Sequence, residues 1–358
     1  MAARDLTDAQ LAVVRAVRPP LGREAGDREA LGREAGGRES GGPESGGRVL
    51  LAVSGGADSL AMAAAVGWEM ASRTRHRAAL PRVGAVVVDH GLQEGSDLVA
   101  EATVATLAGL GLPARVVRGS VRADSPGGPE SVARDLRREL LAEAAGGAPV
   151  WLAHTRDDVA EQVLLGLARG SGARSLAGIP PVQIWSEGDG RGLRMVRPLL
   201  GVTRAETRQA CTDWGLTPWD DPHNDDPRFL RSRVRRRVMP VLEAELGPGV
   251  AAALARTADL LREDADLLDS LTGEWLAEAT DGDDLVVSSL VGVPLARATR
   301  VIRAWLVGRG VTPSREQVLA VHDLVVDWHG QAGVDLPGAS VRRRGGASGP
   351  AALVIVRP

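Results

Sequence analysis

The segment Ser54-Gly-Gly-Ala-Asp-Ser59 gathers hydroxyls, a carboxylate and unhindered backbone amides in one short turn. It follows the apolar run Val49–Val53 and precedes a helical pattern that begins near Ser59. Glycines without Cβ atoms let N–H groups approach an anion closely, and the positive end of the helix dipole points at the same place. The turn therefore predicts a phosphate site made of Ser54, Gly55, Gly56, Ala57, Asp58 and Ser59.

The turn has alternatives among other nucleotide-binding loops and plain glycine-rich turns. It lacks the Gly-Lys-Ser/Thr of a Walker loop and the G-x-G-x-x-G of a dinucleotide-binding fold, which disfavours a P-loop NTPase and an NAD enzyme. A plain glycine-rich turn between a strand and a helix is the simpler alternative. The hydroxyls and the carboxylate around the glycines favour the phosphate site over it.

Asp158 and Glu161 stand three residues apart at the predicted start of another helix. Side chains at this spacing project from one face, so the pair forms a two-carboxylate acceptor for a cation. The alternative is that acidic residues in a first helical turn only complement the helix dipole. His154 ends the preceding strand, where it either orients a reactant or fills a polar end of the core.

Arg134 is the candidate for neutralising charge on a phosphate or on a reacting base, because a planar guanidinium grips two oxygens at once. Its alternative is a solvated helix arginine, like the nearby Arg137 and Arg138. A denser basic group lies further on, at Arg228, Arg231, Arg233, Arg235, Arg236 and Arg237. That density predicts a surface that contacts an RNA backbone, with a solvated helical face as the alternative.

The phosphate turn and the acid pair can form one site only if the strands before them end at the same edge of a sheet. Apolar runs predict strands at Val49–Val53, Val83–Val88, Ala114–Val117, Val150–Ala153 and Met195–Leu199. Helical patterns lie between them at Ser59–Ser72, Ser96–Gly109, Glu130–Ala145, Asp157–Arg169 and Arg204–Trp214. Such alternation indicates a parallel sheet covered on both faces, with ligands where strands end and helices begin. The predicted fold class is α/β, a doubly wound parallel sheet with a second, smaller, mainly helical domain.

Four segments are expected along the chain. Residues 1–48 hold a helix at Thr7–Val17 and then a Gly/Arg/Glu repeat, Gly22–Gly47, with too few apolar residues to fold. Residues 49–215 form the α/β domain, 216–248 the basic connector and 249–358 the C-terminal domain. In the last, helices are predicted at Gly249–Ala279, Leu295–Arg309 and Ser314–Val326, and strands at Val334–Leu336, Ser340–Arg344 and Leu353–Val356.

Composition excludes several classes of protein. The 358 residues are 44% hydrophobic and carry a net charge of −3, which suits globular domains without a strong overall field. The single cysteine, Cys211, excludes a disulfide framework, a four-cysteine zinc site and a Cys-X-X-Cys redox pair. No run of about 20 apolar residues and no signal-peptide block occur, so we expect a cytoplasmic protein without a membrane partner.

The phosphate turn resembles the PP-loop of the N-type ATP pyrophosphatases, which split ATP between the α and β phosphates. Further motifs are Val86–Leu92, Glu130–Arg134, Ala153–Glu161, Leu167–Gly172, Arg197–Leu200 and Trp219–Asn224. In order and spacing they resemble the tRNA(Ile)-lysidine synthetase family, closely from about Val49 to Glu243 and loosely beyond. The sequence departs from the family pattern at Gln93, Thr155, Gln162 and Ser232, where arginine, histidine, threonine and asparagine are usual.

The resemblance implies ATP-dependent ligation of free L-lysine to C2 of the wobble cytidine of a CAU-anticodon isoleucine tRNA. An adenylated cytidine is the intermediate, and AMP and pyrophosphate are released. The resemblance also implies that Gly55 and Gly56 hold pyrophosphate and that Mg²⁺ near Asp58 offsets charge. Asp158 and Glu161, with His154, would position lysine, and the C-terminal domain would recognise the tRNA.

Two rival classes remain open. Another PP-loop enzyme, such as a tRNA thiolase or an amidating synthetase, shares the ATP loop, although such thiolases generally use cysteine pairs and Cys211 is alone. A non-enzymatic nucleotide-binding module needs neither the acid pair nor the basic connector. The sequence leaves the oligomeric state open, a homodimer included.

Overall fold

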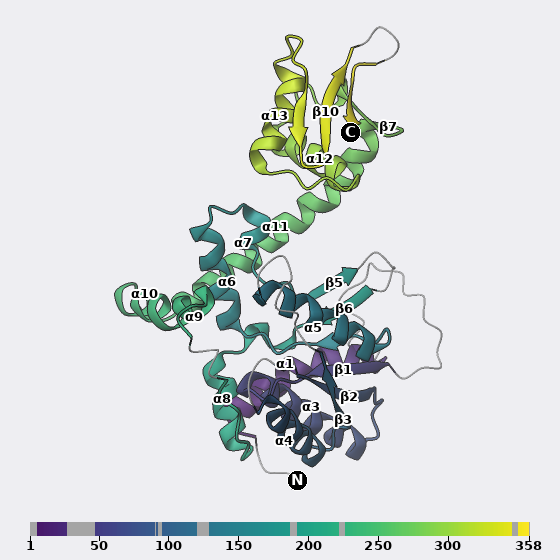
Figure 1. Cartoon of the computed structure of the whole chain (residues 1–358). Coiled ribbons are helices and arrows are strands. Elements are labelled where there is room, and N and C mark those ends of the chain that lie inside the picture. The colour runs from purple at the N-terminus through teal and green to yellow at the C-terminus, as the bar shows by residue number, and fades with distance from the viewer. Residues whose placement is uncertain are drawn as a thin grey trace. The chain divides into compact units, whose positions relative to one another are not determined.

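The computed structural model describes residues 6–26, 47–89, 91, 95–119, 129–186, 192–221, 226–345 and 350–357, without the side chains of 129–134 and 186. The chain divides into two compact units between Leu260 and Leu261. Figure 1 shows helices around a sheet in the first unit and a smaller set of helices and strands in the second. The four-segment division expected from the sequence stays a prediction.

The first unit is built on a six-stranded sheet in the order β3-β2-β1-β4-β6-β5. Its strands are β1 (Arg48–Ala52), β2 (Arg82–Asp89), β3 (Ala114–Arg118), β4 (Val150–Trp151), β5 (Val182–Ser186) and β6 (Gly192–Val196). Neighbouring strands pair in parallel except β5, which runs antiparallel to β6 at the edge. The chain winds outward from β1 in both directions, and doubly wound sheets bind ligands at the carboxyl ends of the strands where the direction switches, here β1 and β4.

Helices cover both faces of this sheet (Figure 1). One face packs against α1 (Asp8–Glu24), α3 (Ala57–Arg75), α4 (Ser96–Gly109) and α8 (Arg204–Asp213), and the other against α5 (Pro129–Ala145). Successive side chains of a strand point to opposite faces, so Leu51 joins the first core layer and Ala52 the second. The doubly wound α/β domain predicted from the apolar runs is confirmed.

Helix α1 is longer than its sequence pattern indicates. Thr7 and Gln10 form a capping box at its start, and the helix continues through Pro19 and Pro20 to Glu24. Leu21 is fully buried, and Glu24 accepts a hydrogen bond from Arg194 on β6 at 2.6 Å. The expected unfolded segment therefore does not begin at Gly22, because burial of this last turn offsets the cost of the internal prolines. Residues 27–46 of that segment lie outside the described part.

The basic connector is helical from Leu230 to Glu245. This part comprises α9 (Leu230–Arg233), a π-helical turn, η3 (Val234–Val238), and α10 (Met239–Glu245), after which α11 runs from Val250 to Ala279. Single π turns inside helices often occur at functional sites. Among the described helices none alone is long and apolar enough to cross a membrane, although Leu230–Leu246 and Val250–Ala279 reach that length and composition jointly across a 98° bend.

The second unit packs helices on an antiparallel sheet. Its core surrounds Ile302 and Trp305 of α12 (Leu295–Val307) and Val321 of α13 (Arg315–Val326). The sheet order is β7-β8-β11-β10-β9, with strands at Thr280–Asp281, Asp284–Val286, Ala352–Val356, Ala339–Arg344 and Val334–Leu336 respectively. The sequence pattern did not predict β7 and β8, because strands of two or three residues carry too little alternation to detect.

Candidate active site

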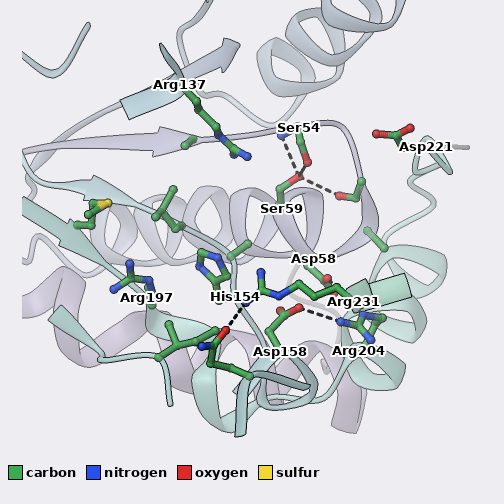
Figure 2. Close-up of a pocket in the computed structure, with 18 of the residues that line it drawn as sticks. Ser54, Asp58, Ser59, Arg137, His154, Asp158, Arg197, Arg204, Asp221 and Arg231 are labelled. Carbon is green, nitrogen blue, oxygen red and sulfur yellow. Dashed lines mark hydrogen bonds and ion pairs between the residues drawn. The ribbon is translucent and has the colours of Figure 1, made fainter. Parts of the chain in front are cut away.

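A cavity of about 990 Å³ opens at the carboxyl ends of β1 and β4. The phosphate turn after β1 supplies Ser54, Asp58 and Ser59, and the segment after β4 supplies His154. Side chains of α5, α6 (Arg156–Ala168), α8 and the basic connector complete the lining. Figure 2 shows these groups pointing toward a common space. The structure thus brings the predicted phosphate turn, acid pair and part of the arginine cluster together.

The phosphate turn has the geometry that an anion requires. Gly55 has a φ of +83°, and a Cβ atom there would lie 2.7 Å from Thr103 Oγ1. Only glycine fits this position without strain. Gly56 is the N-cap of α3, and no side chain caps that helix. The first amides of α3 are therefore available to an external acceptor, as at other helix N-termini that bind phosphate.

Ser59 stabilises the turn. Its Oγ accepts a hydrogen bond from Ser54 N at 3.1 Å and donates one to the carbonyl oxygen of Gly56 at 2.9 Å. The side chain is buried, and its single O–H is used inside the turn. The Ser59 hydroxyl therefore shapes the turn, and the predicted contact of Ser59 with phosphate stays a prediction. Ser54, Gly56, Ala57 and Asp58 line the cavity beside it.

Helix α8 braces the start of α3. Thr207 Oγ1 donates a hydrogen bond to Asp58 Oδ1, and Arg204 Nε lies 3.8 Å from Asp58 Oδ2. Burial raises the pKa of Asp58 above its ordinary value, and the Thr207 hydrogen bond opposes this rise. Cys211 Sγ contacts the carbonyl oxygen of Ala57 at 3.3 Å. Burial raises the pKa of the Cys211 thiol to about 12, so the sulfur stays protonated and has a packing role.

Asp158 and Glu161 share one face of α6, as their spacing predicts. Arg204 spans them, with Nη2 at 3.0 Å from Asp158 Oδ1 and Nη1 at 3.1 Å from Glu161 Oε1. Arg235 adds a two-point contact to Glu161, at 2.8 Å through Nε and 3.1 Å through Nη2. The Glu161 side chain is only 2% exposed. The acid pair is therefore the centre of a buried ion cluster.

This cluster corrects two sequence predictions. Glu161 was expected to receive a substrate cation, but its oxygens already accept from Arg204 and Arg235. Arg235 was expected to contact RNA, but its guanidinium faces the acid pair. Both outcomes follow from burial, because a carboxylate removed from water must be paired with positive charge.

Asp158 divides its two oxygens between two roles. Oδ2 accepts from the amide and hydroxyl of Thr155, at 2.8 and 3.0 Å, so the helix-start alternative holds for this oxygen. Oδ1 faces Arg204 and, at 3.5 Å, Arg235. Burial alone would raise the pKa of Asp158, but Arg204, His154 and the Thr155 amide together lower it. Asp158 is therefore ionised and lies at the cavity wall.

A second set of arginines approaches His154. Arg197, which is 7% exposed, donates to the carbonyl oxygen of Pro180 and to Gln183 Oε1, both at 2.8 Å. Arg231 donates to Gln162 Oε1 at 2.8 Å. Arg137 has no hydrogen bond or ion pair with any described residue. Burial lowers the pKa of His154 to about 4, with Asp158 opposing and Arg197, Arg137 and Arg231 adding to the shift.

The predicted basic cluster separates into inward and outward residues. Arg231, Arg235 and Arg236 line the cavity. Arg228 is 81% exposed and pairs with Asp226 at 2.7 Å. Arg233 donates to the carbonyl oxygens of Pro227 and Arg228, at 2.7 and 3.1 Å. Arg236 and Arg237 are exposed.

Several residues of this site were missed or only partly recognised in the sequence. Arg134 lies on α5, but its side chain is outside the described part. Arg137, three residues further along, lines the cavity. Residues three apart share a helix face, so the repeated arginines were a usable signal. Nothing in the sequence around Arg204 predicted that this residue would pair with Asp158 and Glu161.

Three departures from the family pattern have a structural setting. Thr155 is the buried N-cap residue of α6, where it donates to Asp158. Gln162 accepts from Arg231, and Ser232 is buried in the connector. Gln93 lies outside the described residues.

Comparisons with known proteins agree with this geometry. A family profile described as a PP-loop domain matches residues 38–242, and one described as the TilS substrate binding domain matches residues 285–347. The tRNA(Ile)-lysidine synthase of Leifsonia xyli subsp. xyli is 50% identical over 308 residues, which are 83% of this chain and 88% of that protein. The one of Nocardia farcinica is 48% identical, covering 82% and 86%.

Among solved structures, the U34-tRNA thiolase NcsA from Methanococcus maripaludis has a TM-score of 0.50 and 20% identity, covering 70% of this chain and 78% of that chain. This likeness concerns the fold alone. The identities to the synthases extend over most of both chains, and the PP-loop profile spans the phosphate turn and the acid pair. By sequence and by domain composition, the chain belongs to the tRNA(Ile)-lysidine synthase family.

Proposed function

We propose that this chain ligates free L-lysine to C2 of the wobble cytidine of the isoleucine tRNA with a CAU anticodon, converting ATP to AMP and pyrophosphate. One observation carries the proposal: a single cavity joins an uncapped glycine turn to a buried acid pair at the switch point of the sheet. The reaction takes place in the cytoplasm, where tRNA is modified. A homodimer stays a prediction.

The phosphate turn supports the activation step. O2 of the cytosine attacks the α-phosphate of ATP, and pyrophosphate leaves toward the free amides at the start of α3. A second cavity of about 190 Å³, lined by Val53, Val87 and Val99, adjoins the turn and has the apolar character that a nucleobase needs. Arg137 lines both cavities, and its guanidinium, which has no partner among the described residues, is placed to neutralise phosphate charge between them.

Asp58 suits a magnesium ion. Mg²⁺ in nucleotide sites is held by one or two carboxylates together with substrate phosphates and water. Asp58 lies in the first turn of α3 at the cavity wall, and its Oδ1 accepts a hydrogen bond from Thr207. A bound ion would supply charge neutralisation on the phosphates, and Asp58 would hold it there.

The acid cluster supports the second step, in which an amine of lysine attacks C2 and AMP is expelled. Asp158 lines the cavity whereas Glu161 lies behind it, so Asp158 supplies the carboxylate that attracts the ammonium group and Glu161 holds the two arginines that shape this wall. His154 remains neutral because burial holds its pKa at about 4. A neutral imidazole can accept a hydrogen bond from an ammonium without repelling it.

The direct test is incorporation of radiolabelled lysine into the minor isoleucine tRNA, with and without ATP. We expect labelling that requires ATP and that is lost when the wobble cytidine is replaced by uridine. The transcript of an elongator methionine tRNA, which also has a CAU anticodon, is the matched control. Labelling without ATP, or no labelling of the isoleucine transcript that carries the wobble cytidine, would contradict the proposal.

Arg237, which is exposed and does not line the cavity, predicts a salt effect on tRNA binding. Replacing Arg237 with glutamine should lower the slope of log Kd against log salt by up to about 1 unit, since each phosphate contact releases about one counterion. Arg228→Gln is the matched control, because Asp226 already neutralises Arg228 and its removal should change the slope little. Filter binding at a series of salt concentrations measures both. An unchanged slope in the Arg237→Gln variant would identify a solvated face.

A further inference from the structure

Thr207 is a fully buried polar residue to which the proposed reaction gives no role. It lies on α8 and is 0% exposed. Its Oγ1 donates a hydrogen bond to Asp58 Oδ1 on α3, 149 residues earlier in the chain. The same Oγ1 lies 2.9 Å from the carbonyl oxygen of Arg204, one turn earlier in α8. Thr207 therefore has two acceptors within reach of one hydroxyl group.

The two acceptors are not equivalent. A threonine hydroxyl carries one proton, so it donates to one acceptor at a time. A threonine inside a helix can donate to a carbonyl oxygen one turn earlier, and Arg204 offers that oxygen to Thr207. A hydrogen bond to an ionised carboxylate is about twice as strong as one between neutral groups. The hydroxyl is therefore directed to Asp58 although its own helix could satisfy it, and the contact fixes the position of the carboxylate.

The carboxylate of Asp58 presents two different oxygens. Oδ1 meets the hydroxyl of a fully buried residue, so it faces the interior of the first unit. Oδ2 lies 3.8 Å from Arg204 Nε, which is too long for a hydrogen bond. The Asp58 side chain is 26% exposed and lines the main cavity. Within the described contacts, Oδ2 is thus the oxygen left to a ligand in the cavity.

Helix α8 holds the backbone of this turn as well. Cys211, one turn beyond Thr207, contacts the carbonyl oxygen of Ala57, the residue before Asp58, at 3.3 Å. Ala57 and Cys211 belong to the same buried core, and α8 itself begins with a capping box. A carboxylate whose backbone and one oxygen are both fixed by a neighbouring helix has little freedom to turn.

We propose that Thr207 is a positioning residue that makes Asp58 a one-oxygen metal ligand and thereby favours Mg²⁺ over Ca²⁺ in the nucleotide site. The inference rests on the proposed function, in which Asp58 holds the metal ion of ATP. Mg²⁺ is small, requires near-octahedral geometry and takes few carboxylate oxygens beside phosphate and water. Ca²⁺ is larger and accepts carboxylates through both oxygens. Holding Oδ1 away from the cavity withholds the second oxygen that Ca²⁺ would use.

Metal competition tests the role of Thr207. Mn²⁺ is paramagnetic and takes the same oxygen ligands as Mg²⁺ and Ca²⁺. It is bound to enzyme in excess over ATP, without tRNA or lysine, and displaced by Mg²⁺ or by Ca²⁺ while electron paramagnetic resonance follows the free Mn²⁺. The measured quantity is the Ca²⁺ concentration that displaces half of the Mn²⁺, divided by the corresponding Mg²⁺ concentration. This ratio does not change when both metals are weakened equally.

Thr207→Val keeps the shape of the side chain and removes the hydroxyl. We expect this substitution to lower the ratio by about 10-fold, which is the scale of one hydrogen bond to a charged group. Thr207→Ser keeps the hydroxyl and should keep most of the preference for Mg²⁺. Thr207→Ala also removes the hydroxyl and repeats the test if Thr207→Val proves unstable in thermal melting.

Thr212→Val is the matched control on the same helix. Thr212 is exposed, and its Oγ1 donates to the carbonyl oxygen of Arg208 at 3.2 Å, so it has no contact with Asp58. Its replacement should leave the ratio within about twofold of wild type, as for most surface substitutions.

Two outcomes would overturn the inference alone. One is an unchanged ratio in Thr207→Val and Thr207→Ala, which would show that Thr207 only stabilises α8. The other is a ratio that falls as far in Thr207→Ser as in Thr207→Val, since the hydroxyl would then not be responsible. If the wild-type enzyme binds no Mn²⁺ with ATP, the proposed function and the inference both fail. If the ratio shifts as expected but lysine is not ligated, the proposed function fails and the role of Thr207 stands.

Discussion

The Asp58→Asn substitution is expected to reduce ATP–pyrophosphate exchange, measured with tRNA present, by at least about 100-fold. A loss of this size is typical when one preorganised electrostatic contact to a reacting group is removed. The amide has the shape of the carboxylate and can still accept the Thr207 hydrogen bond. It lacks the negative charge that would hold a metal ion beside the phosphates. The fold should therefore persist while activation fails.

Asp220→Asn is the matched control for this experiment. Asp220 lines the same cavity, but it is 76% exposed and paired with Arg208 on the surface. Its replacement should leave exchange within a fewfold of wild type. Circular dichroism and thermal melting establish that both variants are folded. Normal exchange in a folded Asp58→Asn protein would falsify the assignment of the turn as the ATP phosphate site.

The Glu161→Gln substitution is expected to lower the free energy of unfolding of the first unit by about 3–5 kcal/mol, which is the usual cost of removing one partner of a buried ion pair. The Glu161 side chain is 2% exposed and accepts from two guanidiniums, so its loss leaves Arg204 and Arg235 undercompensated. For a unit of this size the change corresponds to a Tm lower by roughly 6–20 °C. Thermal unfolding followed by circular dichroism measures the shift.

Asp135→Asn is the control for the loss of an ion pair as such. Asp135 pairs with Arg138 at 3.1 Å but is 52% exposed, and exposed pairs contribute less than about 1 kcal/mol. If the Glu161→Gln protein has the same Tm as the Asp135→Asn control, the buried ion cluster does not stabilise the fold.

Asp158 adds a pH dependence with a definite sign. Its lowered pKa means that its contribution is present above the ordinary value of 3.8 and is lost as the pH falls through the lower folded value.

The sequence by itself determined the parallel strands of the sheet and the phosphate turn, because both depend on local patterns; it did not predict the antiparallel edge strand β5. Continuous apolar runs alternating with helical periodicity predict buried parallel strands, and α4 occupies the predicted range Ser96–Gly109. Gly55 was identified as necessary from the chemistry of the turn, and its φ of +83° supplies the reason. The one-face arrangement of Asp158 and Glu161 likewise follows from helix geometry alone.

Only the tertiary structure decided which charges meet. Arg204 and Arg235 lie 43 and 74 residues from Glu161 along the chain, yet they fill the positions that the helix pattern left for a substrate cation. Spacing within a helix cannot show a partner contributed by another element. The same limit applies to Arg197, whose hydrogen-bond partners are the carbonyl oxygen of Pro180 and the side chain of Gln183. Secondary structure arises from neighbours in sequence, whereas the pairing of buried charges depends on which side chains the packed fold removes from water together.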